Sequence, residues 1–174
     1  DSSGGGAIYN TETLNITDTN ITHNTADNGD GGAIINLAGN LNIRTSNLTN
    51  TNAYQNGGAI TNTGTVNVTG TNIIHNTAEQ GGAIRNYEGT LHISESNLDY
   101  NNAKQEGGSI WNYGKLNIKL STLNNNTANE DGGAILVSSN SLANDISYSV
   151  FEGNNATNGD GGAIYWDASS GEIS

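Results

Sequence analysis

The sequence predicts an all-β fold: a right-handed parallel β-helix, or solenoid, of about seven coils with 24–29 residues and three short strands each. Two observations carry this prediction. A Gly-Gly-(Ala/Ser)-Ile segment recurs seven times at near-constant spacing, and two further apolar segments follow most copies in fixed register. Repeats of this length cannot bury an apolar face alone and must stack. We therefore expect residues 1–174 to form a single β-helix repeat domain.

The first strand of each predicted coil follows the paired glycines. The copies begin at Gly5, Gly31, Gly57, Gly81, Gly107, Gly132 and Gly161. The Ile of each copy is expected to point into the solenoid. Glycine has no Cβ, so the pair allows the chain to turn a corner close to the neighbouring coil.

The second and third strands come from apolar residues at fixed distances. Leu14-Asn15-Ile16 shows the apolar-polar-apolar alternation of a half-buried strand, and similar segments recur in later copies. A third anchor, Ile21 in the first copy, opens an apolar-x-x-Asn-x-Ala pattern. The sixth copy has an insertion around residues 138–144, yet Ile146 and Phe151 keep the spacing. The register of the coil is thus expected to survive the insertion.

Composition alone gives a competing prediction and excludes several function classes. Fewer than one residue in five is Ile, Leu, Val or Phe, and the formal net charge is −12, values typical of disordered chains. The regular register favours the folded solenoid, because winding gathers the apolar residues along one axis. The negative charge excludes nucleic acid as a partner. The chain has no cysteine and no apolar run long enough for a membrane span.

Asparagine recurs at two positions of the repeat that are expected to face corners. We predict that these residues form structural ladders, in which side-chain amides bond from coil to coil and satisfy turn backbone. The first ladder is Asn10, Asn36, Asn62, Asn86 and Asn112, and the second is Asn24, Asn76, Asn101, Asn126 and Asn154. The alternative is an Asn-rich binding stripe.

The GGAI segment together with Phe151-x-x-Asn154 resembles the repeat of chlamydial polymorphic outer-membrane proteins. The Asn/Thr-rich, acidic composition is similar to that of adhesin-like surface proteins of methanogenic archaea, and the likeness covers the whole chain. Ile or Leu replaces the family's Phe in five of six copies, which favours the archaeal type. The resemblance implies an extracellular or cell-surface, non-enzymatic module that attaches to other cell surfaces, glycans or partner proteins.

Aromatic residues recur at outward positions of the first strand and just after it. Exposed rings in a row are typical of a surface that contacts sugar rings or a partner protein. The alternative is ordinary cross-strand packing on a broad sheet. The predicted binding residues are Tyr9, Tyr87, Trp111, Tyr113 and Tyr165.

The residues just before the paired glycines include stacked acids in the later copies. Hard cations such as Ca²⁺ prefer oxygen ligands, so Glu106, Asp131 and Asp160 form a candidate calcium site. The alternative is a solvated acidic turn that keeps the solenoid soluble. No other cofactor is expected.

Enzymatic activity is the least favoured function. Polysaccharide-active β-helix enzymes need clustered carboxylates and usually a basic residue. Here the outward positions of the second strand carry Asn or His in the first five copies. The five basic residues fall on different coils or faces: Arg44, Arg85, Lys104, Lys115 and Lys119.

Two further expectations concern modification and assembly. Six Asn-x-Thr sequons predict N-glycosylation at Asn15, Asn20, Asn47, Asn67, Asn125 and Asn155. No polar capping element is visible at either end of the sequence. We therefore expect either a segment of a longer array, which is favoured, or end-to-end stacking into an extracellular filament, which is an alternative function to adhesion.

Overall fold

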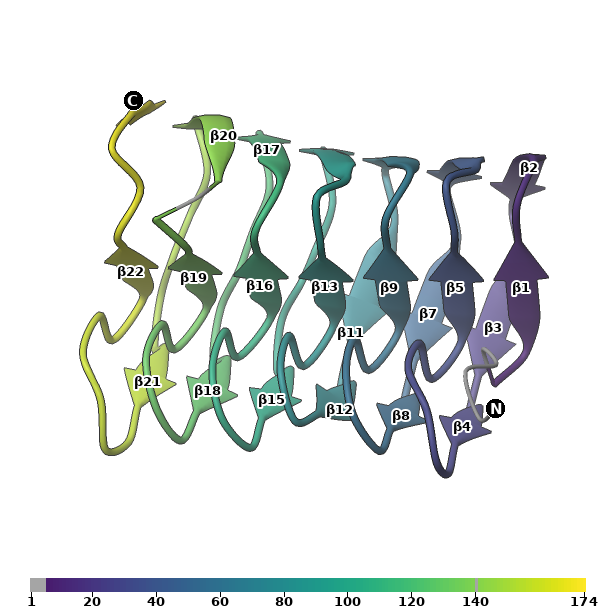
Figure 1. The fold of residues 1–174 in the computed structure, drawn as a ribbon, viewed down its shortest axis with the longest axis horizontal. Coiled ribbons are helices and arrows are strands. Elements are labelled where there is room, and N and C mark those ends of the chain that lie inside the picture. The colour runs from purple at the N-terminus through teal and green to yellow at the C-terminus, as the bar shows by residue number, and fades with distance from the viewer. Residues whose placement is uncertain (1–5, 140) are drawn as a thin grey trace.

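The computed structural model describes residues 6–139 and 141–174, and in this part of the chain it contains strands and no helix. The chain climbs one side of a solenoid, crosses the top, descends behind and advances one coil at a time (Figure 1). This winding is right-handed. All strand pairs are parallel and join each coil to the next, which confirms the predicted fold class.

Two seven-stranded sheets form adjacent sides of the solenoid. The first sheet consists of β1 (Ile8–Asn10), β5 (Ile34–Asn36), β9 (Ile60–Asn62), β13 (Ile84–Asn86), β16 (Ile110–Asn112), β19 (Ile135–Val137) and β22 (Ile164–Trp166). The second consists of β2 (Thr13–Thr17), β6 (Asn40–Arg44), β10 (Thr65–Thr69), β14 (Thr90–Ser94), β17 (Lys115–Lys119), β20 (Leu142–Ser147) and β23 (Gly171–Ile173). Equivalent repeat positions pair, as predicted: Ile34 pairs with Ile60.

The remaining sides carry shorter strands. The third sheet contains β3 (Asn20–Thr22), β7 (Asn47–Thr49) and β11 (Asn72–Ile74), and single bridges continue it as far as Val150. The fourth sheet contains β4 (Thr25–Ala26), β8 (Asn52–Ala53), β12 (Thr77–Ala78), β15 (Asn102–Ala103), β18 (Thr127–Ala128) and β21 (Asn155–Ala156). The sequence predicted three strands per coil, and the fourth sheet adds a two-residue strand after the third.

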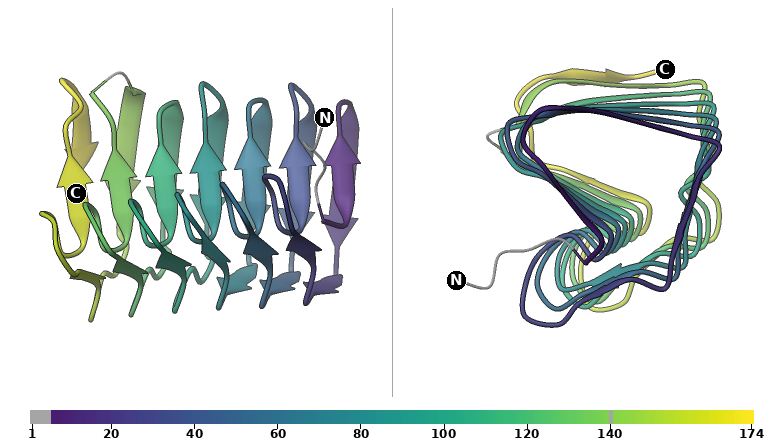
Figure 2. Two further views of the ribbon diagram at one scale, coloured as in Figure 1. Left: turned by 60° about the horizontal axis from the view of Figure 1, so that its bottom comes forward. Right: turned by 90° about the vertical axis from the view of Figure 1, so that its right-hand side faces the viewer.

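Viewed along its axis, the solenoid has one outline repeated from coil to coil, indented along the first sheet (Figure 2). The corners of this outline require left-handed backbone. The residues after the second-sheet strands have φ between 44° and 58°: Asp18, Thr45, Gly70, Glu95, Leu120 and Tyr148.

The paired glycines form the corner before the first sheet. Gly81 has a φ of +61°, which glycine adopts without strain. A Cβ on Gly82 would lie 2.2 Å from the carbonyl oxygen of Gly108 in the next coil. The second glycine of the pair is thus required by close stacking of the coils, as predicted.

The core is a column of identical or similar apolar side chains. Ile34, Leu41 and Leu48 of the second coil are fully buried, and their counterparts stack above and below them. Successive coils lie about 4.8 Å apart, so each apolar side chain contacts its equivalent in the next coil. This regular contact explains how a chain with so few large apolar residues buries a continuous interior.

The first set of asparagines forms a buried ladder between the first and second sheets. Asn36 donates to Asn62 over 2.8 Å, and Asn62 donates to Asn86 over 2.7 Å. The same bond joins Asn10 to Asn36 and Asn86 to Asn112, both at 2.7 Å. The amide of Asn86 also donates to the Gly89 carbonyl, so the ladder satisfies the turn backbone.

The second set forms a ladder from the third coil onward. The Oδ1 of Asn101 accepts the backbone N–H of Asn76 at 2.9 Å, and Asn126 and Asn154 continue the pattern. Asn24 differs from the predicted arrangement. Its amide donates to the Thr22 carbonyl at 3.2 Å. Thr51 occupies the equivalent position in the second coil, and its backbone N–H donates to Asn76.

Candidate binding surfaces

The outward face of the first sheet is partly covered by the turns that precede the paired glycines. Ile35, Thr61 and Leu136 point away from the core, yet each is less than 8% exposed. Thr61 also donates to the Asn56 carbonyl in the covering turn. The outward row is therefore not the continuous exposed surface that the sequence suggested. Tyr9 at one end is exposed, and Tyr165 near the other end is half-buried.

Four residues on two adjacent coils form the aromatic cluster: Arg85, Tyr87, Trp111 and Tyr113. The guanidinium carbon of Arg85 lies 4.9 Å from the ring centroids of both Tyr87 and Trp111. The rings of Tyr87 and Tyr113 stack at 5.2 Å with planes 11° apart, and Trp111 and Tyr113 stack at 6.0 Å. Tyr87 is exposed, whereas Trp111 and Tyr113 are half-buried. The structure thus brings three predicted binding residues together around a cation that the sequence analysis did not include.

Burial shapes the chemistry of Arg85. Desolvation lowers the pKa of its guanidinium, and the negative charge of Asp30 partly opposes this effect. Its Nε is buried without a hydrogen-bond partner among the described residues. Arg85 also lines a cavity of about 150 Å³ with Tyr9, Asp30 and Leu37. The cation remains charged at neutral pH, because an arginine guanidinium does not deprotonate in this range.

The acidic residues of the candidate calcium site do not converge on one point. Glu106 Oε2 accepts the indole N–H of Trp111 at 3.0 Å and an amide hydrogen of Gln80 at 3.3 Å. Asp131 accepts the backbone N–H of Asp160 at 2.7 Å. Within the described residues, no group of three or more His, Asp or Glu side chains is arranged to hold a metal ion. Glu106 instead fixes the orientation of Trp111 in the aromatic cluster.

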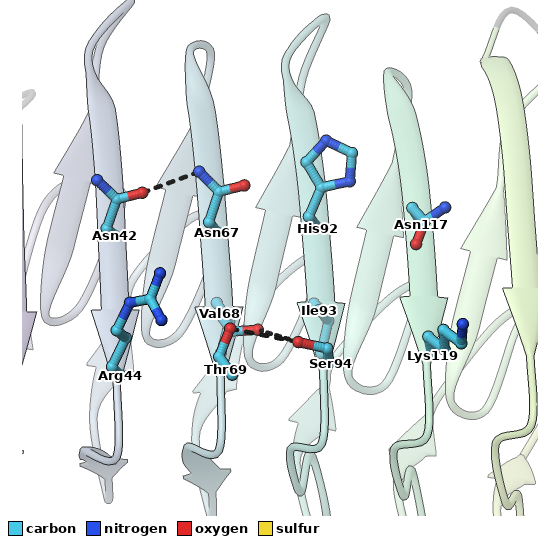
Figure 3. A pocket seen from close by; sticks show the side chains of 10 residues that line it. All are labelled: Asn42, Arg44, Asn67, Val68, Thr69, His92, Ile93, Ser94, Asn117 and Lys119. Carbon is cyan, nitrogen blue, oxygen red and sulfur yellow. Dashed lines mark hydrogen bonds between the residues drawn. The ribbon is translucent and has the colours of Figure 1, made fainter.

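A second surface lies on the outer face of the second sheet (Figure 3). It contains a hollow of about 380 Å³, called here the second-sheet hollow, which spans β6, β10, β14 and β17. Arg44 lies at one end and Lys119 at the other, with Thr69 and Ser94 between them. The two cations lie on different coils, as predicted, but they share a face. Sequence analysis missed this hollow.

The neighbouring outward row of the same sheet is a hydrogen-bonded series of amides interrupted by histidine. Asn42 donates to Asn15 over 2.8 Å, and Asn67 donates to Asn42 over 2.9 Å. His92 follows and is half-buried. Burial lowers the pKa of His92, and the positive charge of Lys115 lowers it further.

The predicted glycosylation sites fall into two structural groups. Asn47 donates to Asn20 over 2.6 Å in a further outward row on the third sheet, and Asn15 and Asn67 belong to the row on the second sheet. The other two acceptors, Asn125 and Asn155, are exposed and lie outside these rows. The alternation of inward and outward residues in the sequence placed most of these side chains outward, but it did not separate the two groups.

Residues 121–138 and 148–165 each match the family model of the Chlamydia polymorphic membrane protein repeat. Each match runs from the third side of one coil through the paired glycines into the first sheet of the next. This finding confirms the predicted resemblance to the chlamydial repeat. Comparisons with curated proteins and with solved structures gave no match. The structure has no helix in its described residues that could cross a membrane.

Proposed function

We propose that this chain is a non-enzymatic module of a cell-surface protein, and that it attaches to a glycan or a partner protein through the aromatic cluster. The observation that carries the proposal is the stacked arrangement of Tyr87, Tyr113 and Trp111 around Arg85. The match to a membrane protein repeat of Chlamydia supports a surface location.

The cluster has the properties of a binding site held ready for a partner. Tyr, Trp and Arg are enriched among the residues that dominate binding energy, and aromatic rings bury a large area. The stacking contacts restrict the rings before any partner arrives, and the bond from Trp111 to Glu106 restricts the indole. A rigid β-helix would present this cluster in a fixed orientation.

The side chains on the second sheet support a non-enzymatic role. In its first five coils the outward middle row carries Asn15, Asn42, Asn67, His92 and Asn117, and the carboxylates Asp145 and Glu172 follow only in the last two coils, away from the five basic residues' rows. Hydrolysis or elimination on a sugar chain would need paired carboxylates or a carboxylate with a base. An amide neither donates a proton to a leaving group nor accepts one at neutral pH.

The test measures the affinity of the purified chain for cells and compares the parent chain with its variants. A triple variant with Tyr87→Ser, Trp111→Ser and Tyr113→Ser should lose about tenfold or more in affinity, since clustered aromatic residues dominate binding energy. The matched control is Tyr54→Ser, which removes an aromatic ring that is 58% exposed on the fourth side. Circular dichroism and thermal melting establish that each variant folds. Equal attachment by the folded triple variant and the parent chain would contradict the proposal.

A further inference from the structure

The second-sheet hollow concentrates positive charge on a strongly acidic protein. The chain has 17 acidic and five basic residues. Three of the five bases, Arg44, Lys115 and Lys119, project from the outer face of the second sheet. The residues lining the hollow include two of these cations, one histidine and no carboxylate. Such a local reversal of charge is unexpected if this face only serves solubility.

The two cations of the hollow have no acidic partner in the described structure. The one side-chain ion pair within residues 6–139 and 141–174 joins Lys104 to Glu79 at 3.0 Å. The Nζ of Lys119 instead lies 5.8 Å from the centroid of the Tyr148 ring. Among the described residues, no carboxylate lies within ion-pair distance of Arg44. Asp145 takes the next outward position after Asn117, so the cationic stretch ends at the sixth coil.

Between the cations, the hollow presents hydroxyl and amide groups. Ser94 donates to the Thr69 hydroxyl at 3.2 Å, and Asn67 donates to Asn42 at 2.9 Å (Figure 3). These groups retain lone pairs and hydrogens beyond the bonds they make to each other. They can therefore pair with the hydroxyl groups of a sugar chain laid across the strands.

We propose that the second-sheet hollow binds a glycan that carries uronate carboxylates, with one carboxylate at Arg44 and a second at Lys119. The guanidinium of Arg44 can hold a carboxylate through two parallel hydrogen bonds, and Lys119 supplies a point charge. The two sites are three coils apart, about 14 Å along the axis. The intervening sugars lie over Thr69 and Ser94.

Other anionic partners fit this surface less well. A peptide partner would need a pocket for an apolar anchor, whereas the hollow is lined mainly by polar and charged side chains. A densely charged chain, such as nucleic acid or a heavily sulfated glycan, would meet only two separated cations and the repulsion of a protein of net charge −12. A uronate chain carries one charge per sugar, fewer than a heavily sulfated glycan, so it meets less of this repulsion.

The first experiment measures binding of hexagalacturonate to the whole chain by calorimetry. The fully methyl-esterified hexamer is the matched probe, because it keeps the sugar backbone and loses the charge. Arg44→Gln and Lys119→Gln should each weaken binding of the acid by about three- to tenfold, and the ester should bind more weakly than the acid. The control is Lys104→Gln, which removes one positive charge from a different side of the solenoid and should leave binding unchanged. Binding should also weaken as salt is added.

Three results would overturn the proposal. The first is unchanged binding by folded Arg44→Gln and Lys119→Gln variants. The second is an equal loss in Lys104→Gln, which would mean that only net charge matters. The third is tighter binding of the ester, or of a heparin hexasaccharide, than of hexagalacturonate.

The site is independent of the aromatic cluster, and the variants separate the two. The triple aromatic variant should bind hexagalacturonate as the parent chain does. Loss of uronate binding in that variant, with retention in Arg44→Gln, would place the glycan on the first sheet and refute the assignment to the hollow. Failure of cell attachment alone would affect only the proposed function.

Discussion

The side-chain amide of Asn112 donates a hydrogen bond to Oδ1 of Asn144 over 3.1 Å, although the two residues do not pair in the sheets. The strand partner of Asn112 is Val137, which breaks the asparagine ladder. Asn144 comes from the insertion of the sixth coil. Its Oδ1 also accepts the backbone N–H of Leu116 at 3.2 Å, so one inserted side chain satisfies two buried donors.

Replacing Asn144 with Leu should destabilise the solenoid by about 2 kcal/mol or more, because two buried donors lose their acceptor. Chemical denaturation of the variant and the parent chain measures the difference. Ser139→Ala changes an exposed residue of the same insertion and should alter stability by less than about 0.5 kcal/mol. Equal unfolding free energies for the Asn144→Leu variant and the parent chain would show that the hydrogen bonds of Asn144 do not contribute to stability.

The fold could be predicted because the repeat fixes the register of every strand. Once Ile34 is aligned with Ile60, the alternation of side chains along each strand determines which residues face inward. The same alignment identifies most positions of the two asparagine ladders. Asn144 could not be identified in this way. Ile118 pairs with Ile146, so the register survives the insertion as predicted, but a bulge precedes it in the pairing of β17 and β20, and the sequence does not show which inserted residue turns inward.

The inward-outward alternation of a strand predicts which side chains face the surface, but it does not predict hollows or the turns that cover a surface. Arg44 and Lys119 both follow the inward Ile of a second-sheet strand, so a shared face could have been inferred. The hollow between them exists because Thr69 and Ser94 are short, which is a property of neighbouring coils together. Likewise, Ile35 follows the outward pattern but is covered by a turn whose path the sequence does not specify.

Replacing Thr51 with Asn should stabilise the chain, because it extends the second ladder toward the first coil. In later coils the ladder amide also donates to the preceding coil, as Asn76 does to the Leu48 carbonyl at 3.1 Å. An asparagine at position 51 would place its oxygen near the Asn24 backbone N–H. The expected gain is about 0.5 to 1.5 kcal/mol, offset in part by loss of the Thr51 hydroxyl bond to Gly58. Thermal melting checks it, and a lower melting temperature would contradict the prediction.

Stability should fall on mild acidification because of His92. Its folded-state pKa is below the ordinary value of 6.5, so the unfolded chain binds a proton more readily as the pH falls through that value. The positive charge of Lys115 on the same face opposes protonation further, and the carboxylates of this row, Asp145 and Glu172, lie two and three coils away. The free energy of unfolding should therefore decrease between pH 7.5 and pH 5.5, values chosen around the ordinary histidine pKa of about 6.5.

The variant His92→Asn isolates this effect, since asparagine does not titrate. It also completes the outward amide row between Asn67 and Asn117, which should add about 0.5 to 1 kcal/mol at neutral pH. Denaturation curves at several pH values should show a smaller acid-side loss in the variant than in the parent chain. Parallel pH profiles for the two proteins would exclude His92 as the cause.

In a host that modifies Asn-x-Thr sequons, glycans should occupy Asn125 and Asn155 in preference to Asn47 and Asn67. The latter two are half-buried, and each amide nitrogen donates to an asparagine of the preceding coil. Adjacent coils are about 4.8 Å apart, so a sugar attached in such a row would force the neighbouring side chains away and break these bonds. Asn125 and Asn155 are exposed and carry no such bond between coils. Mass spectrometry of peptides from the folded protein measures occupancy at each site, and high occupancy at Asn47 or Asn67 with unmodified Asn125 and Asn155 would refute this assignment.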